Sequence, residues 1–149
     1  MKNTITILAL FVSMTFYAQS NSVIGKWKTI DDRTGYSRAD VEVRKKADGT
    51  YEGIIVETRN IPGSEKLLLC TKCPGQLKDK PFLGLPFIWG FKASPGKPNE
   101  YVNGKVLDPI SGKIYQSKAR LNSTGKRLTL RGQTGENTGM DLIYTRRKD

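Results

Sequence analysis

The chain has 149 residues, a formal net charge of +11 at pH 7 and a mean hydropathy of −0.47. It has two cysteines and no histidine, which excludes Ser-His-Asp and Cys-His catalytic systems and leaves a tetrahedral zinc site short of ligands. This length is enough for one domain with a hydrophobic core.

The first 20 residues have the form of a secretory signal peptide. Lys2 precedes an apolar stretch over 4–17, and small or polar residues follow at 18–20. The apolar stretch is shorter than the roughly 20 residues that a membrane-spanning helix needs, although an N-terminal membrane anchor is the alternative. We therefore expect a signal peptide over 1–20, a mature domain over 21–149 without a transmembrane segment, and export to the periplasm or the medium.

The rest of the chain reads as short strands separated by turns. Residues 39–44 alternate between an apolar face and a polar face, as in a half-buried strand. Asp48-Gly49 is a hairpin signal, and the turns at 94–99, 108–113 and 122–126 are rich in Gly, Pro, Asn, Asp and Ser. The expected strands cover residues 23–30, 39–43, 51–58, 83–92, 100–107, 114–121, 127–133 and 140–147.

Eight short strands joined by hairpin-length turns pair as antiparallel neighbours. Closure of such a meander removes its exposed edges. The sequence therefore predicts an all-β fold, a single antiparallel up-and-down eight-stranded β-barrel, with a two-sheet sandwich as the competing architecture. A barrel of this size is either filled by side chains or holds one small ligand.

Residues 59–80 form the longest irregular stretch and contain both cysteines, Cys70 and Cys73. In an exported protein the pair predicts a disulfide that pins this loop. Free or metal-binding thiols and a redox-active pair are the alternatives. A redox pair usually lies at the start of a helix, whereas Pro74-Gly75 follows here and nothing nearby reads as a helix.

The apolar stretch from 80 to 91 is the most distinctive part of the sequence. If it is regular, Leu83 and the alternate residues through Phe91 share one large apolar face, while Ile88 falls on the opposite, small face. Pro86 lacks an N–H, which favours a bend or bulge. The large face either fills the core or lines a cavity. The candidates for ligand-lining residues are Phe87, Trp89, Phe91 and Tyr115, the last of which equally suits cross-strand packing.

Gly25-Lys26-Trp27, on the first expected strand, resembles the G-x-W motif of lipocalins and related barrels. This resemblance implies that the Trp packs over the closed end of the barrel and that a basic residue on the last strand lies against it. The barrel-closing residues implied in this chain are Gly25, Trp27 and Arg146.

The whole domain, from about residue 25 to 146, resembles the Domain-of-Unknown-Function 2147 family of exported bacterial proteins. The matching blocks are 25–27, 80–85, 104–109, 112–115, 130–132 and 145–146. This resemblance implies a lipocalin-like barrel. It implies no established activity, and it supplies no catalytic residue and no cofactor.

The function expected from the sequence is non-catalytic binding of a small apolar or amphipathic ligand. The alternative is a cell-envelope interaction module with a filled core, whose basic surface binds an acidic partner such as an anionic envelope surface. An oligonucleotide-binding barrel is disfavoured by the signal peptide, so a nucleic-acid partner is not expected. An enzyme would need carboxylates from different strands to converge. We predict no catalytic residue, no metal site and no cofactor.

Overall fold

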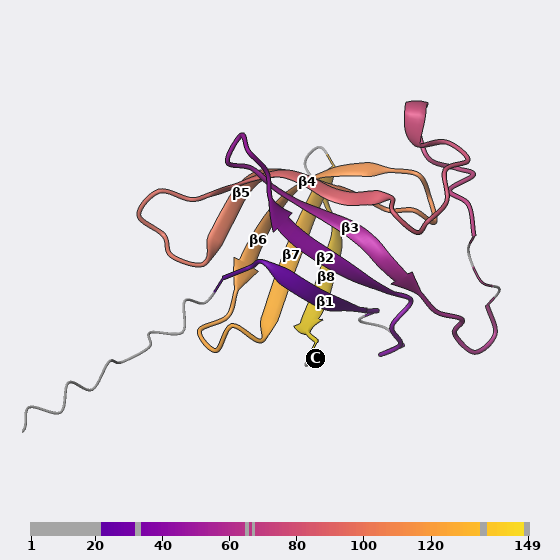
Figure 1. The fold of residues 1–149 in the computed structure, drawn as a ribbon, viewed down its shortest axis with the longest axis horizontal. Helices are drawn as coiled ribbons and strands as arrows, with labels where there is room; N and C mark the ends of the chain where they lie inside the picture. The colour runs from indigo at the N-terminus through magenta and orange to yellow at the C-terminus, as the bar shows by residue number, and fades with distance from the viewer. Residues whose placement is uncertain (1–21, 32–33, 65, 67, 135–136, 148–149) are drawn as a thin grey trace, which may run out of the picture.

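In the computed structural model, eight antiparallel strands close into a barrel (Figure 1). The structure describes residues 22–31, 34–64, 66, 68–134 and 137–147, and for 134 and 137–143 it describes the backbone alone. Each strand pairs with its neighbours in the sequence, and the last strand pairs with the first. The predicted signal peptide over 1–20 lies outside the described residues.

This architecture confirms the predicted all-β, up-and-down, eight-stranded barrel, and the sandwich alternative is wrong. Within the described residues, no helix is long and apolar enough to cross a membrane. The strands are β1 Gly25–Ile30, β2 Ala39–Lys45, β3 Tyr51–Thr58, β4 Pro86–Ala93, β5 Glu100–Leu107, β6 Ile114–Leu121, β7 Arg127–Thr134 and β8 Asn137–Arg146.

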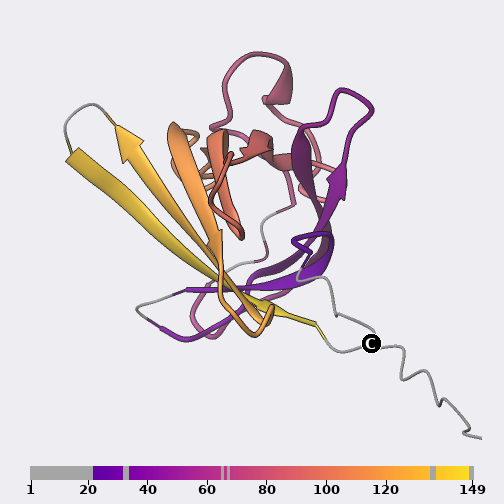
Figure 2. The same cartoon turned by 90° about the vertical axis from the view of Figure 1, so that its left-hand side faces the viewer.

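The two ends of the barrel differ in how they are covered. The short turns β2–β3, β4–β5 and β6–β7 gather at one end, together with the segment 22–24 that leads into β1. The other end carries three longer connections, 31–38, 59–85 and 108–113. The longest connection includes the short 3-10 helix η1 (Gly75–Leu77) and projects from the barrel (Figures 1 and 2). We call the end with the short turns the closed end and the end with the longer connections the open end.

The predicted disulfide between Cys70 and Cys73 is confirmed, and it lies in the connection 59–85. This connection folds back on itself, because the N–H of Cys70 donates to the carbonyl of Lys80 at 2.9 Å and Leu69 bridges to Pro81. Both cysteines are buried. The described part of the connection is therefore held by local pairing rather than by a long regular element.

The predicted alternation over 83–91 is wrong, because β4 is irregular. The strand begins at Pro86, not at Leu83, whose side chain is 57% exposed. The register against β3 shifts on both sides of Ile88, so β4 accommodates an extra residue at each shift. Each β-bulge reverses the facing of the residues that follow it. Phe87 and Ile88 are consequently both buried.

Two glycines in neighbouring strands make room for the apolar side chains of β4. A Cβ atom on Gly53 would lie 2.5 Å from Cγ1 of Ile88, and one on Gly104 would overlap the ring of Phe91. Glycine in a strand often marks such a close approach. The apolar side chains of the irregular β4 thus pack in the barrel core, in the space that these glycines of β3 and β5 leave open.

Candidate ligand-binding site

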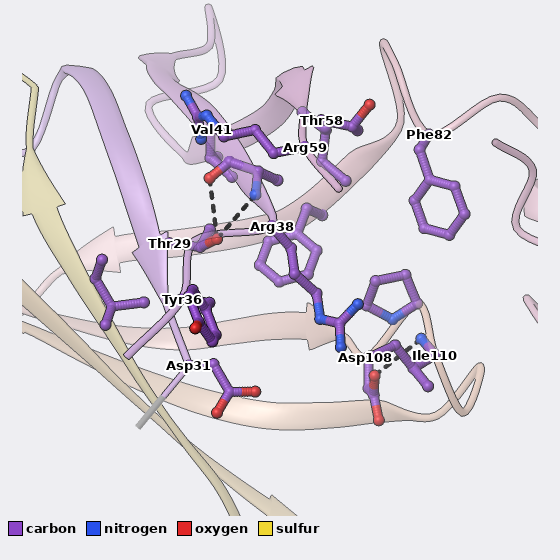
Figure 3. A pocket seen from close by; sticks show the side chains of 15 residues that line it. Thr29, Asp31, Tyr36, Arg38, Val41, Thr58, Arg59, Phe82, Asp108 and Ile110 are labelled. Atoms are coloured by element: carbon purple, nitrogen blue, oxygen red, sulfur yellow. Dashed lines mark hydrogen bonds between the residues drawn. The ribbon is translucent and has the colours of Figure 1, made fainter. Parts of the chain in front are cut away.

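A cavity of about 150 Å³ opens at the open end of the barrel (Figure 3). Three connections and the ends of four strands contribute to it. Its described lining residues are Thr29, Ile30, Asp31, Tyr36, Arg38, Ala39, Val41, Ile55, Thr58, Arg59, Phe82, Phe87, Asp108, Pro109 and Ile110.

The inner part of the cavity is apolar. Val41 and Ile55 come from paired positions of β2 and β3, and both are buried. Phe87 reaches the cavity from β4, and Phe82 reaches it from the connection that precedes β4. Aromatic and branched aliphatic walls of this kind remove an apolar ligand from water.

The rim of the cavity is polar, and its two described carboxylates are held by hydrogen bonds within their own loops. The Asp108 carboxylate accepts hydrogen bonds from the backbone N–H of Ile110 at 3.0 Å and from the Ser111 hydroxyl at 2.6 Å. Asp31 accepts one from the N–H of Thr34 at 3.0 Å. These bonds fix both carboxylates at the mouth of the cavity.

The two arginines among the described lining residues have different surroundings. Arg59 donates to both carboxylate oxygens of Asp40, at 2.8 and 2.7 Å, and lies 3.0 Å from the Glu57 carboxylate. Arg38 donates from Nη1 to the Ser64 hydroxyl at 3.0 Å, and its Nε is buried with no partner among the described residues. Figure 3 shows the Arg38 guanidinium on the cavity side, toward Asp108, whereas that of Arg59 points away.

The disulfide turn supports one wall of the cavity. Sγ of Cys70 lies 3.7 Å from the carbonyl oxygen of Pro109, which lines the cavity. A Cβ atom on Gly112 would overlap the carbonyl oxygen of Lys72, so the turn rests directly against the β5–β6 connection. The disulfide and the cavity mouth are thus parts of one packed unit.

The predicted ligand-lining residues are not brought together at one site. Phe87 lines the cavity at the open end, and Phe91 lines a separate void of about 10 Å³ deeper in the barrel. Trp89 and Tyr115 are not among the described residues that line either space. Trp89 is half-buried and pairs with Lys105, and Tyr115 is buried and pairs with Val106.

The closed end contains the residues that the G-x-W motif implied. Trp27 is fully buried, its Nε1 donates to the carbonyl of Val23 at 2.8 Å, and the Arg146 guanidinium lies over its ring. Gly25 has φ +128°, and a Cβ atom there would lie 3.0 Å from Nη1 of Arg146. The three residues therefore meet at the closed end, far along the barrel from the cavity mouth.

Sequence reasoning missed the polar residues of the site and its support. Arg38 and Asp108 lie in connections, where no periodicity marks which side chains face inward. The alternation over 39–44 predicts Asp40 on the polar face of its strand, yet it is fully buried between Arg59 and Arg147. The sequence signal that could have indicated Arg38 and Asp108 is their position, because each residue lies next to a strand at the open end. Among the described residues, no cluster of His, Cys, Asp and Glu could hold a metal ion.

The fold and the cavity at its open end define the class as a lipocalin-like β-barrel. The solved structure of HP1028 from the human pathogen Helicobacter pylori, described as belonging to the lipocalin family, matches with a TM-score of 0.68 and 19% sequence identity. The match covers 86% of this chain and 84% of that chain, and at this identity it shows the fold alone.

The particular family follows from the sequence. Residues 25–146 match the family described as "Uncharacterized protein conserved in bacteria (DUF2147)". The chain belongs to this family, which confirms the resemblance drawn from its sequence blocks. No curated protein matches the chain.

Proposed function

We propose that this protein is an exported, non-catalytic binding protein that holds a small amphipathic molecule in the cavity at the open end of its barrel. The observation that carries the proposal is the cavity itself, with its buried apolar walls and its polar rim. A lipocalin-like barrel suits this role, because a closed barrel of eight strands can hold one small ligand.

The volume limits the size of the bound group. An apolar cavity of roughly 150 Å³ accommodates benzene in an engineered protein, and pockets for drug-sized ligands start at roughly 300 Å³. The cavity here is about 150 Å³. The group it encloses therefore has about six to ten non-hydrogen atoms, either as a whole ligand or as one end of a longer molecule.

Binding of toluene and benzyl alcohol, followed by ¹H–¹⁵N NMR of the mature protein, tests the proposal. We expect shift changes at Val41, Ile55 and Phe87, which line the cavity. Ala39→Leu fills part of the cavity and is expected to abolish these changes. Ala93→Leu is the matched control, because Ala93 is exposed at the closed end of β4. Absence of binding by either probe, or equal loss in both variants, contradicts the proposal.

Export is tested separately on the intact protein. We expect cell fractionation to place it outside the cytoplasm and its mass to correspond to a chain without residues 1–20. A full-length chain retained in the cytoplasm contradicts this part of the proposal.

A second candidate function is favoured by the surface of the connection 59–85. Leu68, Leu69 and Leu83 are 65%, 47% and 57% exposed there. The same connection carries exposed lysines at 66, 72, 78 and 80. Exposed apolar side chains with a cationic rim suit an anionic lipid surface, in which leucines enter the interface and lysines remain at the headgroups.

Vesicle sedimentation tests this candidate. Binding to phosphatidylglycerol vesicles is expected to exceed binding to phosphatidylcholine vesicles and to fall with salt, since the Debye length shrinks to about 3 Å at 1 M. Leu68→Ser with Leu83→Ser removes the apolar contribution. Val56→Ser, at a side chain 39% exposed on β3, is the control. Equal binding to both vesicles contradicts this function.

A further inference from the structure

We propose that the ligand of the open-end cavity carries a carboxylate, and that Arg38 binds this carboxylate through its Nε and Nη2. The inference rests on the proposed function and adds to it the chemical class of the ligand, a small carboxylic acid with an apolar body. It assigns to Arg38 a role in specificity.

Arg38 has hydrogen-bonding capacity that the protein leaves unused. A guanidinium has five N–H donors. In Arg38, Nη1 donates to the Ser64 hydroxyl, and no other hydrogen bond or ion pair of its side chain occurs with the described residues. The Nε atom is buried and has no partner in that part of the chain. Buried donors without partners are rare in native proteins, and an absent ligand is one explanation for them.

The position of the one existing bond determines which edge of the guanidinium is open. Nη1 is engaged with Ser64, so the edge formed by Nε and Nη2 has no partner among the described residues. This edge presents two parallel N–H groups, which match the two oxygens of a carboxylate. Arg59 uses the other edge, Nη1 and Nη2, for its two bonds to Asp40. The lining thus contains Arg59, which has carboxylate partners, and Arg38, which has none among the described residues.

The other charged groups among the described lining residues already have partners within the protein. Arg59 is bound by Asp40 and Glu57. Asp108 accepts hydrogen bonds from its own loop, and Asp31 accepts one from the N–H of Thr34. An amine could still approach these carboxylates, and it is therefore the main alternative ligand. The unmet donor on Arg38 favours an anion over an amine.

The apolar walls explain the other half of the ligand. The cavity of about 150 Å³ encloses a group the size of a phenyl ring between Val41, Ile55 and Phe87. Arg38 lines the same space. A molecule that extends from the apolar walls to the Arg38 guanidinium therefore satisfies both parts of the cavity, the apolar surface and the free edge.

The test compares phenylacetate, phenylacetamide, 2-phenylethylamine and toluene by NMR titration at pH 7. We expect phenylacetate to bind about ten-fold or more tightly than the isosteric amide, because hydrogen bonds to a charged partner are the stronger ones. The Arg38 Nε–H resonance is expected to shift with phenylacetate and not with toluene. Arg38→Gln is expected to remove the preference for the acid over the amide.

Arg120→Gln is the matched control, because Arg120 is exposed on the outer face of β6, and it should preserve the preference. Equal affinity for acid and amide, or a preference for the amine, overturns the inference and leaves the proposed function standing. Failure of all four probes overturns both. If Arg38→Gln also loses toluene binding, the Arg38 Nε–H resonance of the wild-type protein decides whether the inference holds. The inference is overturned if phenylacetate does not shift this resonance.

Discussion

The guanidinium carbon of Arg146 lies 4.3 Å from the centroid of the Trp27 ring, and the two residues are opposite one another in the β1–β8 pairing. The guanidinium also donates to the carbonyls of Ser22, Ile24 and Gly125. One side chain on the last strand thus covers the buried Trp and joins the entry to β1 with the β6–β7 turn. The closed end depends on this pair.

Arg146→Lys is expected to lower the free energy of unfolding by about 2–3 kcal/mol. A lysine keeps the charge, but its ammonium cannot stack as a plane over Trp27 and bond all three carbonyls at once. Urea unfolding measures the change. Arg120→Lys on the exposed face of β6 is the control and should change it by less than about 0.5 kcal/mol. Equal effects would contradict the role of Arg146.

Asp40→Asn is expected to destabilise the barrel at pH 7 by about 2–3 kcal/mol. Asp40 is fully buried and is paired with Arg59 and Arg147. Burial alone raises the pKa of this carboxyl, but the hydrogen bonds and charges of Arg59 and then of Arg147 outweigh it, so the net pKa is below the ordinary value of 3.8. The variant leaves two guanidinium groups without their buried partner.

The sign of the pH dependence follows from that lowered pKa. The carboxyl of Asp40 has a pKa of about 3.9 in the unfolded chain and a lower pKa in the folded protein. Between these two pKa values the unfolded state therefore binds more protons than the folded state. The contribution of Asp40 to the free energy of unfolding is therefore present above about pH 4. It is lost as the pH falls through the lower pKa of the folded state. Unfolding curves from pH 6 to 2 should show a flatter acid decline in Asp40→Asn. Parallel declines would contradict this contribution.

The barrel could be predicted because its signals are local. Ala39, Val41 and Val43 alternate in the sequence, and the structure places Val41 and Val43 in the core and Ala39 in the cavity lining. Asp48 and Gly49 form the β2–β3 turn, where Asp48 accepts from the N–H of Thr50. Alternation and turn chemistry are properties of adjacent residues, and closure follows from their repetition.

The site could be predicted only in part, because it depends on contacts between distant residues. Phe87 follows from the apolar strand, but the register shifts of β4 and the burial of Ile88 depend on the room that Gly53 leaves on another strand. The facing of Arg38 depends on how the connections meet at the open end. Periodicity carries no information about such meetings.

Tyr144→Phe is expected to stabilise the protein by about 1 kcal/mol. Tyr144 is 1% exposed in the core against Phe87, with ring centroids 6.5 Å apart, and its hydroxyl has no partner among the described residues. Replacement by Phe removes an unmet buried polar group and keeps the ring packing. Thermal or urea unfolding measures the gain, and Tyr36→Phe at an exposed tyrosine is the control. A loss of stability would show that the hydroxyl has a partner.

Tyr144 should also make the protein less stable at alkaline pH. Burial raises the pKa of the Tyr144 phenol, whereas a tyrosine in the unfolded chain ionises at about pH 10. Above that pH the folded state holds more protons than the unfolded state, so wild-type stability falls as the pH rises. Tyr144→Phe should weaken this decline between pH 9 and 11. Part of it should persist, because burial also raises the pKa of Tyr101.

Gly112→Ala tests whether the disulfide turn supports the cavity mouth. Gly112 has φ +76°, and a Cβ atom there would overlap the carbonyl of Lys72. Gly96 is a matched control, because its φ is +70° and a Cβ atom would meet nothing within 4 Å. Both variants have the same backbone strain, about 1–2 kcal/mol, so any further effect of Gly112→Ala comes from displacement of the turn.

We expect Gly112→Ala to lower the free energy of unfolding by at least about 1 kcal/mol more than Gly96→Ala, as overpacking typically does. We also expect it to weaken toluene binding, because the displaced turn contacts Pro109 through Cys70, and Pro109 lines the cavity. Reduction of the disulfide in the wild type should weaken binding in the same direction. If Gly112→Ala is destabilised but binds toluene with unchanged affinity, the turn supports the fold and not the site.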